Sequence, residues 1–282
     1  MNHKDILGKL QALDLTQIPN KEIKELLTIL FQFGIPIITT DYNYPKIIER
    51  AVNNTEEETE FNSKSRISFK PAAYNTTYQR ASTPETTMFY ASVIPEGELS
   101  TSEIEYSRII GAWETVDVLR ENSDGERLIT FGQWQIQEQV SVMTIFDPNL
   151  DYQVKYINEV RDFYNKQRLP EDLNQIRNDV LGYLAFEFSK VVSKGNNHDY
   201  MISAILTELA TANGADGVLY PSVQGNGAGL CVSLHPRIMN KLKLVKVLQC
   251  KLTKKGNEAK LLNIKHCEVK DNSETFKLEE IK

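Results

Sequence analysis

The chain has 282 residues, of which 41% are hydrophobic and 25% are charged, an ordinary balance for a globular protein that excludes a wholly disordered chain. Its formal net charge is −6 at pH 7, so it carries no global positive field that would attract nucleic acid or an anionic membrane. The longest apolar run, residues 26–38, is broken by Gln32, Gly34 and Pro36 and is too short to cross a bilayer. The first residues lack the apolar core of a signal peptide. We therefore expect a cytoplasmic protein that binds neither membranes nor nucleic acid directly.

The first part of the chain is predicted to be a short helical N-terminal extension over residues 1–60, followed by one larger domain over residues 61–282. The polar and acidic stretch 53–65 is typical of a surface loop between the two. Two short runs then have the β-branched and aromatic composition of strands, at 65–69 and 87–92.

A helix is predicted to begin near residue 100. Its start has two possible capping boxes, in which a serine hydroxyl and a glutamate three residues later bond to the first backbone N–H groups: Ser100 with Glu103, or Ser102 with Glu105. An apolar stripe follows at the spacing of one helix face, formed by Ile109, Trp113 and Val116.

The second half of the chain alternates strands and helices less regularly. Two runs at 128–137 and 139–146 alternate with period two, which predicts a pair of strands. Two helices are expected after them, one following Pro170 and one ending at Asn213-Gly214. Further strands are predicted at 217–222, 230–234, 241–252 and 259–269. Because the strands flank a helical middle, the pattern indicates an α+β fold and not a regular βαβ series.

The residues that usually bind metals or form disulfides are few and scattered. The three cysteines and four histidines show no CxxC pair and no cluster, so neither a metal site nor a disulfide framework is predicted. Asp199, beside His198 at a helix start, is more simply an N-cap than half of a catalytic dyad.

Four polar residues stand where a strand meets a turn or where a helix has an apolar face. Arg80 lies in a loop, Tyr90 lies in the strand after it, Glu114 follows Trp113 on the predicted helix, and Ser222 ends a strand before a glycine-rich turn. Taken singly, each has an ordinary structural explanation as a surface arginine, a core tyrosine, a helix-face glutamate or a turn serine.

Three segments that carry these four residues resemble the RES-domain family, named for its arginine, glutamate and serine. The segments are RASTPETTMFYAS, RIIGAWETVDVLR, and YMISAILTELATANGADGVLYPS followed by GAGLCVSL. The resemblance implies a fold related to the ADP-ribosyltransferases, with central strands and packed helices. It also implies an enzyme that takes NAD⁺ as its substrate, cleaves the nicotinamide–ribose bond and passes ADP-ribose to phosphate, water or a protein. A bacterial toxin with a small antitoxin partner is the implied context; a homodimer is left open.

The same resemblance assigns roles to the four residues. A guanidinium at Arg80 can bind the pyrophosphate bidentately, and a carboxylate at Glu114 can stabilise the positive charge that builds on the ribose. Tyr90 can pack against the nicotinamide or ribose, and Ser222 can hydrogen-bond to either. Arg66, in the first strand-like run, is a further candidate for a phosphate contact. None of these roles requires a metal.

The chain also departs from the family pattern. Ser82 and Cys231 stand where the family commonly has asparagine, and 23 residues separate Tyr90 from Glu114, more than in compact members. Glu103 and Glu105 are therefore rival candidates for the glutamate. The alternative function is a binding or scaffold module that keeps the fold without the catalysis.

Overall fold

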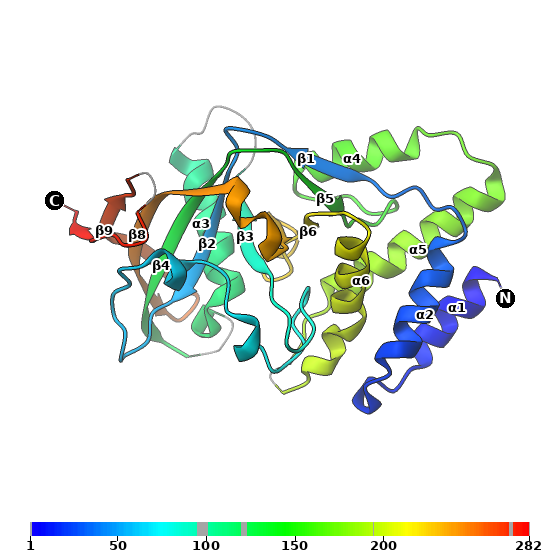
Figure 1. Cartoon of the computed structure of the whole chain (residues 1–282), viewed down its shortest axis with the longest axis horizontal. Coiled ribbons are helices and arrows are strands. Elements are labelled where there is room, and N and C mark those ends of the chain that lie inside the picture. Colours follow the sequence, from blue (N-terminus) through cyan, green and yellow to red (C-terminus); the bar gives the residue numbers. More distant parts are fainter. Residues whose placement is uncertain (1, 95–100, 120–122, 194, 271–272, 282) are drawn as a thin grey trace.

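The protein folds around one mixed sheet with helices packed against it (Figure 1). The computed structural model describes residues 2–94, 101–119, 123–193, 195–270 and 273–281, without the side chains of residues 101–106. The α+β architecture expected from the sequence is present.

The helices lie in two places. The helices in the described part are α1 (His3–Ala12), α2 (Asn20–Phe31), α3 (Thr101–Thr115), α4 (Lys155–Asn165), α5 (Glu171–Ser189) and α6 (Met201–Ala212). Helices α1, α2, α5 and α6 pack against one another at the side of the molecule where the N-terminus lies, and α6 also packs against β6, whereas α3 packs against β2 and β3 (Figure 1). No helix in the described ranges combines the length and apolar composition needed to span a membrane.

In the described part of the chain, the strands form a ten-stranded sheet in the order β1-β5-β6-β7-β3-β2-β4-β8-β9-β10. Their bounds are β1 (Thr39–Tyr42), β2 (Ile47–Asn53), β3 (Phe89–Val93), β4 (Gly125–Ile136), β5 (Val140–Thr144), β6 (Gly217–Pro221), β7 (Leu230–Leu234), β8 (Leu242–Lys255), β9 (Glu258–Glu268) and β10 (Glu279–Glu280). The β5–β6 pair is parallel, which makes the sheet mixed, and the two pairs of β2, with β3 and β4, are antiparallel.

The sheet cannot be flat, because strands that are close in the sequence lie far apart in the strand order. Five strand spacings of about 4.8 Å each, roughly 24 Å in total, would separate β4 from β5 in a flat sheet. The chain joins them between Ile136 and Val140, a link that can extend to at most about 14 Å. The sheet must therefore curve strongly, and one face of it becomes concave.

Two predictions in the first 70 residues were wrong. Helix is present only in the first half of the predicted extension, because residues 39–42 and 47–53 form β1 and β2. These strands join the main sheet, and β2 lies near its centre, between β3 and β4. The strand predicted at 65–69 is instead a short 3-10 helix over Lys64–Ile67, which buries Ile67 completely.

The two strands predicted at 128–137 and 139–146 are present as β4 and β5, but they do not pair with each other. β4 pairs with β2 and β8, and β5 pairs with β1 and β6. The three residues between them carry the chain from one part of the curved sheet to another.

Candidate functional site

A cavity of about 1190 Å³ lies over the middle of the sheet, and three of the four predicted site residues line it: Arg80, Tyr90 and Glu114. The fourth, Ser222, contacts Glu114 directly. The structure thus brings together four side chains that span 142 positions of the sequence.

Strand register explains why several of these residues meet. Residues opposite each other in paired strands share a face of the sheet. Ser92 is opposite Cys231, which is opposite Tyr220. Since side chains alternate along a strand, Tyr90 lies on the same face as Ser92, and Ser222, two residues after Tyr220, continues on that face. Helix α3, which carries Glu114, packs against β2 and β3 beside them.

Glu114 and Ser222 form an acidic corner, which we define as these two residues and the backbone of Gln224 and Gly225. The Ser222 hydroxyl donates to Glu114 Oε1 at 2.6 Å, and the Gln224 N–H donates to the same oxygen at 3.0 Å. The Gly225 N–H donates to Ser222 Oγ at 3.0 Å. Ser222 is 1% exposed. Its hydroxyl therefore orients the carboxylate and is itself oriented by the loop backbone.

Two glycines allow the loop after β6 to approach α3 this closely. A Cβ on Gly225 or Gly229 would lie 2.6 Å from side-chain carbons of Ile110, closer than real Cβ atoms come. Ile110 precedes Glu114 by one helical turn, so both residues lie on the same side of α3. The glycine-rich turn seen in the sequence thus has a packing role, which is to let Ser222 reach Glu114.

Arg80 lines the cavity where it meets the end of α5. Its Nη1 donates to the carbonyl of Phe188 and its Nη2 to that of Lys190 at 3.1 Å. Its guanidinium carbon lies 5.0 Å from the centre of the Tyr200 ring. Carbonyls at a helix C-terminus have no partner within the helix, so Arg80 caps α5. Two of its five N–H groups are used in these bonds.

Tyr90 joins the loop of Arg80 to the sheet. Its hydroxyl lies 2.8 Å from Ser82 Oγ and accepts from the Ala81 N–H at 3.2 Å. Burial raises the pKa of Tyr90 to about 12, so the phenol is neutral at physiological pH. Ser82 is thus a hydrogen-bond partner of Tyr90.

Arg50 on β2 also lines the cavity, and the sequence analysis missed it. Its Nη1 donates to the Tyr90 carbonyl at 2.8 Å, whereas its Nε is buried without a partner. Burial lowers the pKa of Arg50 to about 10, which leaves it cationic at neutral pH. The β-branched residues Ile47 and Ile48 are typical of a strand, but the sequence analysis above predicts a helical extension over this region.

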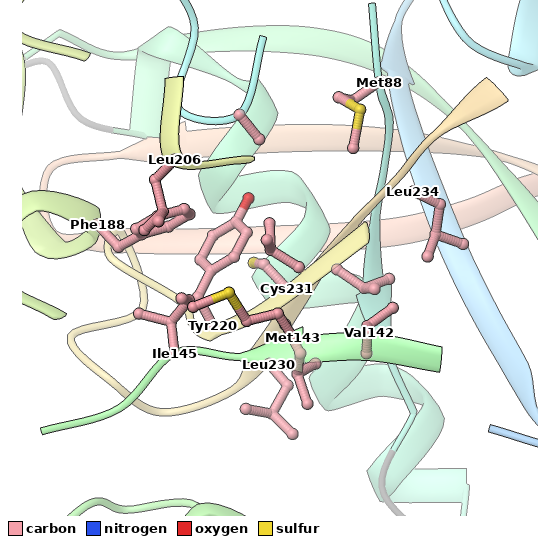
Figure 2. Close-up of a cluster of buried hydrophobic side chains, with 14 of the residues drawn as sticks. Met88, Val142, Met143, Ile145, Phe188, Leu206, Tyr220, Leu230, Cys231 and Leu234 are labelled. Carbon is pink, nitrogen blue, oxygen red and sulfur yellow. The ribbon is translucent and has the colours of Figure 1, made fainter. Parts of the chain in front are cut away.

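The cavity also has an apolar side. Tyr220 and Cys231 belong to a buried cluster with Phe188, Met143 and others, shown in Figure 2. Burial, with the nearby charge of Glu114 as a smaller cause, raises the pKa of the Cys231 thiol well above its usual range. Cys231 is therefore protonated at neutral pH and is a poor nucleophile.

The structure does not bring Arg66 to this group. The Arg66 guanidinium pairs with Glu58 and lies 4.8 Å from the ring centre of Phe61, and Arg66 is not among the residues that line the cavity. The side chains of the rival glutamates Glu103 and Glu105 lie outside the described residues. Among the residues described, no group of three histidine, cysteine or acidic side chains could hold a metal ion.

Comparison with models of known protein families gave no match, and comparison with curated proteins gave none either. The resemblance to RES domains therefore stays a prediction.

Proposed function

We propose that the protein cleaves the bond between nicotinamide and ribose in NAD⁺ and passes ADP-ribose to an acceptor. One observation carries the proposal: the Glu114 carboxylate, held by the Ser222 hydroxyl at 2.6 Å, shares a cavity with two guanidinium groups, Arg50 and Arg80. An ordered carboxylate that lines the same cavity as two cationic groups suits a substrate with a reacting sugar and a pyrophosphate.

The acidic corner suits the bond-breaking step. When the C1′–N bond breaks, its electron pair goes to the nicotinamide nitrogen, which becomes neutral, and positive charge develops on the ribose ring. A preorganised carboxylate stabilises such a charge because it does not have to reorient as the charge forms. The Ser222 hydroxyl and the Gln224 N–H hold the Glu114 carboxylate in a fixed orientation.

The two arginines that line the cavity suit the pyrophosphate. Guanidinium groups bind phosphate oxygens through two parallel hydrogen bonds. Arg50 donates one N–H to the Tyr90 carbonyl, Arg80 donates two to the end of α5, and each guanidinium has five N–H groups in all. The neutral phenol of Tyr90 between these arginines adds an aromatic surface that can shield the sugar from water.

The test is release of nicotinamide from NAD⁺ by the purified chain, followed by chromatography with and without inorganic phosphate. We expect release by the wild type and none by Glu114→Gln, whose amide keeps the size of the side chain but not its charge. Glu126→Gln, a change of an exposed glutamate that pairs with Lys251, is the matched control and should be fully active. A wild type that is folded by circular dichroism but releases no nicotinamide would contradict the proposal. Binding of NAD⁺ without turnover would favour the binding-module alternative.

We extend the proposal to a toxin role. Depletion of NAD⁺ would arrest growth of a bacterial cell, and a partner protein would be needed to restrain it. Induced expression of the wild type should lower intracellular NAD⁺ and stop growth, whereas Glu114→Gln should do neither. Incubation of a lysate with labelled NAD⁺ and mass spectrometry would show whether a protein, phosphate or water accepts the ADP-ribose.

A further inference from the structure

A buried ion pair ties α3 to the strand beside the cavity. Arg108 Nη2 on α3 lies 3.1 Å from Glu49 Oε1 on β2, and the two side chains are 6% and 0% exposed. Gln133 on β4 donates to the same Glu49 oxygen at 3.1 Å. The pair therefore joins three elements within the core.

Burying this ion pair costs more desolvation free energy than burying an apolar contact of similar size. Glu49 Oε2 and Arg108 Nε are both buried without a partner, and burial raises the pKa of Glu49 even beside Arg108. The desolvation of two charges often exceeds their attraction, so an apolar pair of similar size is commonly as stable or more stable. Stability alone is thus a weak reason for an ion pair at this place.

The position of the pair relates it to the cavity. Glu49 is followed directly by Arg50, and both residues line the cavity. Arg108 lies six residues before Glu114 on the same helix. A rigid helix transmits a shift at Arg108 to Glu114, whereas the contact of Ile110 with the glycine loop restrains α3 from another side.

We propose that Glu49 and Arg108 are positioning residues: their ion pair sets where Glu114 stands along the sheet relative to Arg50. The expected fall in kcat rests on the proposed function, but the expected displacement of α3 does not. An apolar contact lacks the direction of a hydrogen-bonded ion pair, so it would let α3 settle at a different place without unfolding the protein.

The experiment replaces both charges, in the double variant Glu49→Leu/Arg108→Met. We expect a thermal midpoint equal to or above that of the wild type, a kcat about 10-fold lower and a KM within about 3-fold. A mere stabilising role predicts no change in kcat at equal stability. The exposed pair Lys155 and Glu159 on α4, changed to Met and Leu, is the control and should leave kcat unaltered.

A second measurement does not need activity. Trp113 precedes Glu114, and the other tryptophan, Trp134, is fully buried. The difference between the fluorescence spectra of the wild type and Trp113→Phe is therefore the emission of Trp113, which reports on the α3 end of the cavity. We expect its emission maximum to shift in the double variant. An unshifted spectrum and an unchanged kcat in the double variant would overturn the inference. If the wild type is inactive but the double variant shows the expected shift, only the proposed function is rejected. If the double variant fails to fold, Glu49→Gln/Arg108→Gln takes its place, because it removes both charges and keeps polar side chains. A wild-type kcat and an unshifted spectrum in that variant would also overturn the inference.

Discussion

The two sides of the cavity are built differently. In the acidic corner, Glu114 and Ser222 hold each other through hydrogen bonds between side chains and loop backbone. Of the two arginines that line the cavity, Arg80 is held by carbonyls at the end of α5, and Arg50 by the carbonyl of Tyr90. The corner ties a loop to α3, whereas Arg80 supports a helix end. Substitutions in the two places should therefore differ in how much they change activity and how much they change stability.

The largest effect is expected for Arg80→Ala, because it acts on both folding and function. Losing charge-assisted bonds to one buried and one partly buried carbonyl should cost about 2–4 kcal/mol of the free energy of unfolding, and nicotinamide release should be abolished. Urea denaturation and the release assay measure the two effects. Full stability in this variant would contradict the capping role of Arg80.

Ser222→Ala should affect chemistry more than folding. The Glu114 carboxylate loses its hydroxyl donor, and we expect kcat to fall about 10²-fold. The buried Gly225 N–H loses its acceptor, so the free energy of unfolding should fall by about 1–3 kcal/mol. Ser233→Ala is the matched control, because Ser233 is also buried and bonds the Tyr220 hydroxyl at 3.2 Å. Equal activity of the two variants would mean that the corner has no catalytic part.

The role of Arg50 can be tested by the affinity for ADP-ribose and by the pH dependence of that affinity. Arg50→Gln should weaken ADP-ribose binding about 10-fold, as loss of one charge-assisted contact does, measured by calorimetry. Since burial lowers the pKa of Arg50 to about 10, its charge is present at neutral pH and is lost as pH rises through that value. Wild-type affinity should therefore decline above about pH 9, and the affinity of Arg50→Gln should decline less. Parallel curves for the two proteins would rule out Arg50 as the cation involved.

The smallest effect concerns the cysteines. Burial raises the pKa of the Cys231 thiol well above its usual range and that of Cys250 to about 12, whereas Cys267 is only half-buried. At pH 8, iodoacetamide should label Cys267 first and leave activity unchanged, as peptide mass spectrometry would show. Rapid labelling of Cys231 would indicate that the apolar side of the cavity opens in solution.

Much of the secondary structure followed from local pattern. Helix α3 was predicted from its apolar periodicity, and β3, β6 and β7 from composition and alternation, because these signals depend on neighbouring residues only. The predicted stripe was wrong at Ile109, which is 39% exposed, whereas Ile110 is buried. The segment containing β2 was missed because it is short and follows a helical region. The 3-10 helix at Lys64–Ile67 looked like a strand because Ile67 and Phe69 alternate with polar residues.

The sequence by itself determined which residue types were available for chemistry: a helix-face glutamate, a strand-end serine before a flexible turn, and a loop arginine. Only the tertiary structure decided that Glu114 and Ser222 touch, that Arg80 caps α5, that Arg50 belongs to the cavity and that Arg66 does not. The reason is physical. Periodicity and capping act over a few residues, whereas contacts across a curved sheet depend on strand order and register, which the whole core sets together.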